Sequence, residues 1–224
     1  ATASRDGTAR LWNAKNGKPV ATLEGHRGEV ISVAFSPDGA TLATGSGDGT
    51  ARLWNAKNGE LIITLKGHQK AIGSVVFSPD GATLATASWD NTVRLWNARS
   101  SELITALKGH KEVVQSVAFS PDGALLATAS SDDTARLWRV RSGELITALK
   151  GHRSTVASVV FSPDGATLAT ASRDGTARLW RAKDGELITV LKGHQDQVTS
   201  VAFSPDGAAL ATAGWDGTAR LWRG

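Results

Sequence analysis

The sequence contains no cysteine, no methionine and no tyrosine among its 224 residues. The lack of cysteine excludes disulfides and thiol chemistry and leaves the redox compartment open. We expect, as a separate prediction, a cytoplasmic protein. The lack of methionine means that a natural start is missing, so we expect a processed, excised or engineered piece. No apolar stretch approaches the length of a membrane span and no signal peptide is visible, so we expect no membrane partner.

The sequence also lacks any run of basic residues, although its net charge is +4. A positive net charge by itself suggests nucleic acid as a partner. The basic residues are spread through the chain instead, and one column of arginines recurs with an aspartate close by: Arg10, Arg52, Arg94, Arg136, Arg178 and Arg220. We therefore expect no nucleic-acid partner.

A tryptophan recurs at intervals of 42 residues from one end of the chain to the other, and a Gly-His pair recurs with the same step. A fixed interval of this length indicates one supersecondary unit repeated many times. We predict a single domain over residues 1–224. Its repeats cover residues 25–66, 67–108, 109–150 and 151–192, with partial repeats at 1–24 and 193–224.

Each repeat has the pattern of four short β-strands separated by turn residues. Pro-Asp-Gly, Asp-Gly and Asn-Gly sequences are typical of tight turns between antiparallel strands. In residues 25–66 we predict strands a, b, c and d at Val30–Phe35, Thr41–Ser46, Thr50–Asn55 and Leu61–Leu65. The whole chain then holds 22 strands, enough for about five four-stranded units plus one redundant b–c pair. Both faces of these strands are apolar or small and no helix is predicted, so the sheets must cover one another.

The Gly-His pair, the 42-residue period, the Ser-Pro-Asp-Gly turn and the Asp-x-Thr-x-Arg-Leu-Trp strand resemble WD40 repeats over the entire chain. One departure is that the usual Trp-Asp pair is Trp-Asn or Trp-Arg here. The resemblance implies an all-β propeller of radially packed, four-stranded antiparallel blades. Such rings mostly have seven or eight blades and share one blade between the two termini. Five blades would make an unusually small ring, so we expect a homo-oligomer that closes between chains, with a dimer favoured.

Each complete repeat contains a His, a Ser, an Asp and a Trp at constant spacing. Ser, His and Asp together suggest a hydrolase triad, but a catalytic site is normally made once, whereas this set is made four times. The resemblance implies instead a buried, hydrogen-bonded structural tetrad in each repeat, and a satisfied polar network also fixes strand register. The predicted tetrads are His26, Ser46, Asp48, Trp54; His68, Ser88, Asp90, Trp96; His110, Ser130, Asp132, Trp138; and His152, Ser172, Asp174, Trp180.

The histidines have neither a catalytic nor a metal-binding pattern. Each lies in the Gly-His column, one per repeat, with no cysteine or second histidine nearby. The Asp-Gly pairs are explained as turns, because they lack the alternating oxygen ligands of a calcium loop. We therefore expect no catalytic residue, no metal and no cofactor.

The fifth set differs, because Gly214 stands where a serine is expected after His194. The opening segment supplies Ser4, Asp6 and Trp12 with no histidine before them. One interpretation is that N-terminal strands complete the tetrad of His194 and so close the ring. The other is that Gly214 reflects sequence drift.

Variation among the repeats concentrates in the loop from strand d to strand a and in the b–c turn. In a propeller both emerge on one rim, which related proteins use to bind proteins and peptides. Trp89 and Trp215 lie in b–c turns, outside the core column, and are candidate interface anchors; the alternative is unconstrained drift of loop residues. The predicted partner-binding residues are Arg5, Glu29, Trp89, Val113, Gln115, Arg173, Gln197 and Trp215.

Two functions therefore stay open at this point. The first is a non-catalytic scaffold that binds a protein or peptide ligand through its loop face, which the Trp and Arg variation favours. The second is a structural or engineered self-assembling propeller piece without a ligand, which the regularity of the repeats favours. A hydrolase and a nucleic-acid binder rank well below both.

Overall fold

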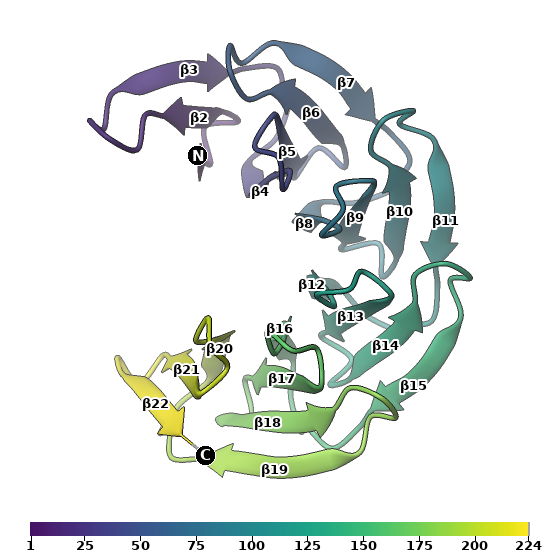
Figure 1. Ribbon diagram of the computed structural model, residues 1–224, viewed down its shortest axis with the longest axis vertical. Helices are drawn as coiled ribbons and strands as arrows, with labels where there is room; N and C mark the ends of the chain where they lie inside the picture. Colours follow the sequence, from purple (N-terminus) through teal and green to yellow (C-terminus); the bar gives the residue numbers. More distant parts are fainter. Residues whose placement is uncertain (224) are drawn as a thin grey trace. The chain divides into compact units, whose positions relative to one another are not determined.

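The structure is a computed structural model that describes residues 1–223, and this range consists of 22 strands with turns and loops and no helix (Figure 1). The strands form six antiparallel sheets of three or four strands, which confirms the predicted all-β fold class. The chain divides into two compact units, Ala1–Gly109 and His110–Gly224, and each is described by itself.

The first unit holds three sheets, each ordered along the chain as a meander. The first sheet has three strands, β1 Thr2–Ala3, β2 Ala9–Trp12 and β3 Pro19–Leu23. The second has four, β4 Val30–Phe35, β5 Thr41–Ser46, β6 Ala51–Asn55 and β7 Leu61–Leu65. The third has β8 Ile72–Phe77, β9 Thr83–Ser88, β10 Val93–Asn97 and β11 Leu103–Leu107.

The second unit also holds three sheets of the same kind. Its first sheet has β12 Val114–Phe119, β13 Leu125–Ser130, β14 Ala135–Arg139 and β15 Leu145–Leu149. The next has β16 Val156–Phe161, β17 Thr167–Ser172, β18 Thr176–Arg181 and β19 Leu187–Lys192. The last has three strands, β20 Val198–Phe203, β21 Ala209–Gly214 and β22 Ala219–Arg223.

The turn residues hold the hairpins as their chemistry requires. Between β4 and β5 the Ser36 hydroxyl donates to Asp38 at 2.5 Å, and the Thr41 amide donates to the Ser36 hydroxyl at 2.9 Å. Gly39 has a φ of 69°, in the left-handed region that glycine adopts without strain. Strand β6 begins one residue later than predicted, because Thr50 belongs to the turn. Its amide and hydroxyl both donate to Asp48, at 2.9 and 2.7 Å.

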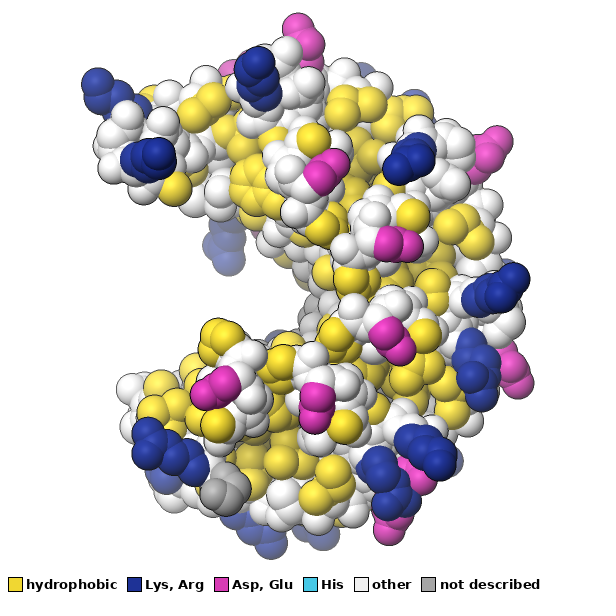
Figure 2. Space-filling view, viewed as in Figure 1, with side chains coloured by type: hydrophobic (Ala, Val, Ile, Leu, Met, Phe, Trp, Pro, Cys, Tyr) yellow, Lys and Arg dark blue, Asp and Glu magenta, His cyan; other side chains and the backbone are white. Residues whose placement is uncertain are grey.

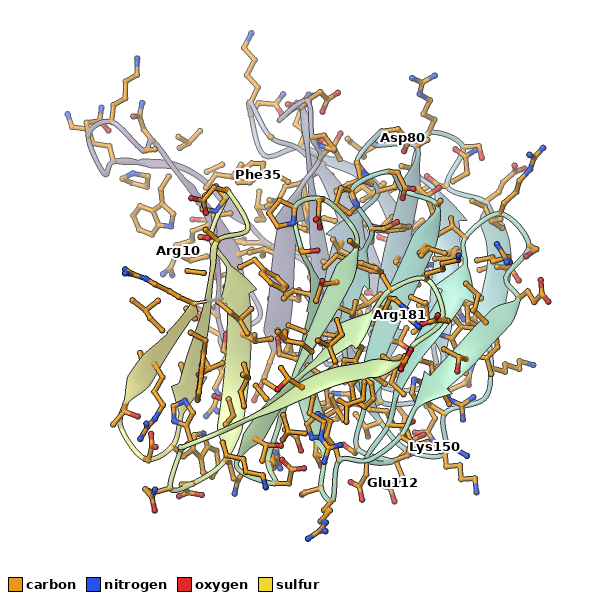
Figure 3. All side chains as sticks on the ribbon, turned by 60° about the horizontal axis from the view of Figure 1, so that its bottom comes forward. Arg10, Phe35, Asp80, Glu112, Lys150 and Arg181 are labelled. Carbon is orange, nitrogen blue, oxygen red and sulfur yellow. The ribbon has the colours of Figure 1, made fainter. Side chains whose placement is uncertain are left out.

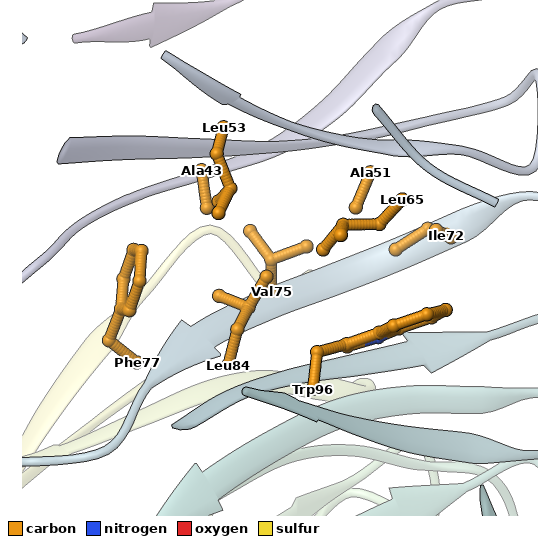
Figure 4. Close-up of a cluster of buried hydrophobic side chains, with 9 residues drawn as sticks. All are labelled: Ala43, Ala51, Leu53, Leu65, Ile72, Val75, Phe77, Leu84 and Trp96. Atoms are coloured by element: carbon orange, nitrogen blue, oxygen red, sulfur yellow. The ribbon is translucent and has the colours of Figure 1, made fainter. Parts of the chain in front are cut away.

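Neighbouring sheets pack face to face through alternating residues (Figure 4). Side chains in a strand point alternately to its two faces, so each sheet has one set of side chains on each face. One cluster in the first unit joins Ala43, Ala51, Leu53 and Leu65 from sheet β4–β7 to Ile72, Val75, Phe77, Leu84 and Trp96 from sheet β8–β11. An equivalent cluster in the second unit joins Leu137 to Trp180. Successive sheets within each unit are therefore joined by equivalent apolar clusters.

Charges of both signs are present on the one face of the molecule that Figure 2 shows. On the face that Figure 2 shows, lysine and arginine side chains lie among acidic, neutral and apolar atoms rather than in one continuous field. A duplex phosphate backbone requires several aligned positive charges. This face offers no such alignment.

Candidate functional site

A chain of four polar side chains crosses each complete sheet from a loop to the core. In sheet β12–β15 the His110 Nδ1 lies 2.8 Å from the Asp132 carboxylate, and its Nε2 lies 2.7 Å from the Thr128 hydroxyl. The Trp138 indole N–H donates to the same hydroxyl at 3.0 Å. The Nδ1–H tautomer satisfies every group, because Nε2 then accepts the Thr128 proton while Thr128 accepts the indole proton.

The predicted serine does not join the histidine to the tryptophan, so this part of the predicted tetrad is corrected. The Ser46 hydroxyl donates to the Gly28 carbonyl at 3.1 Å and accepts the Asp48 amide at 3.1 Å. Ser88, Ser130 and Ser172 have the same role in their sheets. The hydroxyl next to the histidine belongs instead to Thr44, two residues earlier on the same face of the strand, and in the later sheets to Thr86, Thr128 and Thr170.

The sequence does contain a signal for this threonine, which the serine assignment above leaves out. Threonine recurs at the 42-residue step as Thr2, Thr44, Thr86, Thr128, Thr170 and Thr212, without exception. The serine column has an exception at Gly214. Constancy within the repeats therefore distinguished the two hydroxyl columns.

The fifth network is complete despite Gly214, which removes the reason to complete it from the N-terminal strands. His194 lies 2.9 Å from Asp216 and 2.8 Å from the Thr212 hydroxyl, and Trp222 donates to that hydroxyl at 3.0 Å. With glycine at this position, the turn lacks the hydrogen bonds that the serine hydroxyl makes in the other sheets. In the opening segment the Trp12 indole likewise donates to Thr2, at 2.9 Å.

In sheets β4–β7 and β8–β11 the acid and the base of the network are each held in one protonation state. Burial alone would raise the pKa of Asp90, but hydrogen bonds from Thr92, a backbone amide and His68 outweigh it and lower this pKa to about 2. Burial lowers the pKa of His68 below its ordinary value, against the attraction of Asp90. The pKa values of Asp48 and His26 shift in the same directions for the same reasons. Near neutral pH the pairs are a carboxylate and a neutral imidazole.

The recurring arginine covers the tryptophan and explains the glycine of the Gly-His pair. The Arg52 guanidinium lies 5.9 Å from the centre of the Trp54 ring, a cation–π distance, and donates to the Gly25 carbonyl at 2.7 Å. Gly25 has a φ of 129°, and a Cβ there would overlap the Arg52 guanidinium. A side chain at this position therefore meets both backbone strain and a steric clash.

In the first unit the predicted partner-binding residues lie in loops at the same end of their strands. The Arg5 Nε is 4.0 Å from the Glu29 carboxylate, and both side chains are exposed. The Trp89 amide donates to the Ala71 carbonyl at 2.9 Å, which ties the b–c turn to the loop before β8. The Trp89 side chain is 44% exposed, whereas Trp54 in strand β6 is 2% exposed.

In the second unit the d–a loops also share one end. Figure 3 shows Glu112 and Lys150 at this end, away from Arg181 at the end of β18. Gln115 donates to the Ser131 hydroxyl at 2.8 Å, and the Ser131 amide donates to the Val113 carbonyl at 2.9 Å. Val113 and Gln115 are therefore brought together around one turn, and both are only partly exposed.

The last three predicted residues surround the turns of the final two sheets. Arg173 and Gln197 line a cleft of about 370 Å³, together with the Gly-His loop that precedes β20. The Trp215 amide donates to the Gln197 carbonyl at 2.9 Å, and the Trp215 side chain is 65% exposed. The Gln197 Oε1 is buried and has no hydrogen-bond partner within residues 1–223.

Comparison with known proteins identifies the repeats. The sequence profile of the echinoderm microtubule-associated protein second beta-propeller matches residues 1–149. The profile of the WD domain, G-beta repeat, matches residues 143–181 and 185–223. The chain belongs to the WD40-repeat β-propeller family. WD40 propellers are generally non-catalytic scaffolds for protein interactions.

Individual WD40 relatives match over single repeats. The chain is 52% identical over 42 residues to ribosome assembly protein 4 of Chaetomium thermophilum, which covers 19% of this chain and 8% of that protein. It is 49% identical over 43 residues to the WD40 repeat-containing protein HOS15 of Arabidopsis thaliana, again 19% of this chain and 7% of that protein. The chain thus spans less than a tenth of the length of each curated relative in these matches.

The WD40 network has the chemical order of a hydrolase triad without its accessibility. Asp132, His110 and Thr128 are linked as acid, base and hydroxyl, but the Thr128 side chain is completely buried. Its oxygen already accepts the Trp138 indole proton, so no substrate carbonyl reaches it. The arrangement links the Gly-His loop, strand b and strand c of the sheet.

Two further features of the described residues concern metal binding and membrane-spanning helices. Within residues 1–223 no three His, Asp or Glu side chains gather in a way that would hold a metal ion. The same residues contain no helix that is long and apolar enough to cross a membrane.

Proposed function

We propose that this protein is a non-catalytic platform that binds a protein or peptide segment through the b–c turns and d–a loops of its sheets. One observation carries the proposal. Trp89 and Trp215 occupy equivalent positions in separate units and are 44% and 65% exposed. The tryptophans of strands β6, β10, β14 and β18 are at most 4% exposed. An exposed indole in a firmly held turn is a typical interface anchor.

The surroundings of these tryptophans support the same proposal. Protein interfaces combine a few aromatic anchors with a polar, partly charged rim. In the first unit Arg5 and Glu29 supply exposed charges of opposite sign. In the second unit Arg173 and Gln197 line the cleft at the turns. These groups give a peptide both apolar and polar contacts.

The test uses a peptide selected from a random library against the full chain. We expect Trp89→Ser with Trp215→Ser to weaken its binding about thirtyfold or more, since interface anchors contribute at least about 2 kcal/mol. Stability should change by less than about 0.5 kcal/mol. The matched control is Ile62→Ser with Ile188→Ser, because these side chains are 55% and 56% exposed but lie in strands d. Equal binding by the double tryptophan variant would move the site to another face.

A second candidate function is self-assembly, and a different observation favours it. Leu221 in the last sheet is 70% exposed, whereas Leu53 and Leu137 at the same repeat position are 2% and 0% exposed beneath the next sheet. We propose that a second copy covers this face in a homo-oligomeric ring, a dimer being favoured, with the six sheets acting as one domain. A structural or engineered protein without a ligand would need only this ability to assemble with a second copy of itself.

Light scattering of the 224-residue chain tests self-assembly. A dimer mass at micromolar concentration that Leu221→Lys reduces to a monomer mass would support it. A monomer mass for the unaltered chain would rule it out, and the peptide-binding proposal would be unaffected.

A further inference from the structure

Two variable columns of the repeat face each other at the loop end of the sheet. The second residue of strand a lies beside the first residue of the b–c turn that follows it in the chain. In sheet β12–β15 this contact is the hydrogen bond from Gln115 to Ser131, at 2.8 Å. The five pairs are Ile31 with Gly47, Gly73 with Trp89, Gln115 with Ser131, Ala157 with Arg173, and Thr199 with Trp215.

In sheet β8–β11 the pair places a tryptophan directly against the backbone of a strand. A Cβ built on Gly73 would lie 3.0 Å from the Trp89 Nε1 and 3.6 Å from its Cδ1. Such a distance is closer than ordinary van der Waals contact, so the indole occupies the space that any larger residue at 73 would need. In the preceding sheet the sequence reverses the two sizes, with Ile31 in strand a and Gly47 in the turn.

The seated indole leaves one polar group unused. The Trp89 Nε1–H has no hydrogen-bond partner within residues 1–223, whereas the strand tryptophans all donate to a threonine. A tryptophan with an apolar surface and an available donor suits a ligand that has apolar and hydrogen-bonding parts.

An apolar neighbour lies on the adjoining sheet of the same unit. Strands β4 and β8 are in direct contact, because the Val75 amide donates to the Ser32 hydroxyl at 3.2 Å. Ile31 precedes Ser32 and is 36% exposed. The exposed Glu29 and Lys70 flank the two strands on the loop side. Trp89 and Ile31 therefore offer two apolar contacts with charges around them.

We infer that Gly73 is a positioning residue that seats the Trp89 indole against β8, and that the seated indole selects the ligand of the proposed binding face. The ligand is an extended peptide segment. Its apolar side chain packs on Trp89 and Ile31, and its main-chain carbonyl accepts the Nε1–H. A side chain already held in its binding position loses little conformational freedom when the ligand arrives, which raises affinity. This inference rests on the proposed peptide-binding function.

Trp215 shows what the same residue does without the glycine. Its partner position holds Thr199, whose hydroxyl donates to the Ala213 carbonyl at 3.4 Å. Trp215 is 65% exposed, compared with 44% for Trp89. The two tryptophans are therefore unequal, and Trp89 should contribute more to binding.

The experiment measures the dissociation constant of the library-selected peptide for full-chain variants. Trp89→Ser should raise it about thirtyfold or more. Gly73→Ile should raise it by a similar factor although the tryptophan is retained, because the isoleucine displaces the indole from its seat. Trp215→Ser should raise it less than about threefold, since its indole is not seated. The matched variant Gly73→Gln with Trp89→Ser copies the pair found at 115 and 131, so it should keep the thermal unfolding midpoint and lose binding.

Each other outcome has a defined meaning. Unchanged affinity in the Gly73→Gln, Trp89→Ser variant would overturn the inference and leave the binding function in place at another position. Unchanged affinity in Gly73→Ile alone would overturn the positioning role of Gly73. If no peptide is selected by the unaltered chain, the proposed function and this inference both fail.

Discussion

Thr128 is completely buried in β13, with its hydroxyl between the His110 imidazole and the Trp138 indole. We expect Thr128→Val, which keeps the side-chain shape, to cost about 3 kcal/mol of unfolding free energy. The reason is that two buried polar groups lose their partner at once. Urea unfolding followed by circular dichroism measures the change.

Ser130→Ala provides the control for this residue. The Ser130 hydroxyl donates to the Glu112 carbonyl and accepts from the Asp132 amide, and the network around His194 forms with a glycine at the equivalent position. We expect a loss of about 1 kcal/mol. If Ser130→Ala lowered the unfolding free energy as much as Thr128→Val does, Ser130 would have to be counted as a member of the network.

The protonation states of His68 and Asp90 make stability depend on pH. Because burial lowers the pKa of His68 in the folded protein, the unfolded chain binds more protons below about pH 6.5, and stability falls as the pH falls through this region. Asp90, with a pKa of about 2 in the folded protein and 3.8 ordinarily, adds a second loss below about pH 4. Unfolding free energies measured from about pH 8 to about pH 3 test both steps. A constant value between about pH 8 and pH 5 would show that His68 is not held neutral by burial.

The Gly-His turn is the element that joins the arginine column to the network. We expect Gly25→Ala to destabilise the protein by about 3 kcal/mol, because alanine at a φ of 129° is strained and its Cβ would meet Arg52. Gly39→Ala is the matched control, since Gly39 also has a positive φ, 69°, but no atom within 4 Å of its missing Cβ. We expect about 1 kcal/mol there. Equal losses in thermal or urea unfolding would mean that the arginine contact contributes nothing.

The strands were predictable from sequence because their turns contain the residues that the turn geometry demands. Ser36, Asp38 and Gly39 fix the hairpin between β4 and β5 through local hydrogen bonds and one positive φ. Such signals act over a few residues, so a repeat can be divided into strands without knowing its packing.

The site was less predictable because it depends on side chains that are distant along the chain. Thr44 and Ser46 are both small hydroxyl residues on one face of β5, and only the pairing of Leu42 with Trp54 brings the indole to Thr44. Gly73 likewise acquires its role only when Trp89 folds over it from the next turn. Spacing alone gives no information on which of two hydroxyls meets a given ring.

At the scale of the whole chain, near-constant strands are joined by variable d–a loops and b–c turns. The same inter-sheet contacts recur within both units, so changes in the d–a loops and b–c turns leave the core untouched. Six of the eight tryptophans belong to strands c and donate to threonine, at 2.9 to 3.0 Å. The other two, Trp89 and Trp215, lie in turns. This division makes the indole groups reporters of where a ligand binds.

The most direct test is a nuclear magnetic resonance titration of the indole N–H signals with the selected peptide, each signal being assigned by a single Trp→Phe variant. We expect the Trp89 signal to move most and the Trp215 signal to move less, while the signals of the six strand tryptophans stay in place. Movement confined to the strand tryptophans, with Trp89 unchanged, would contradict binding through the loop face.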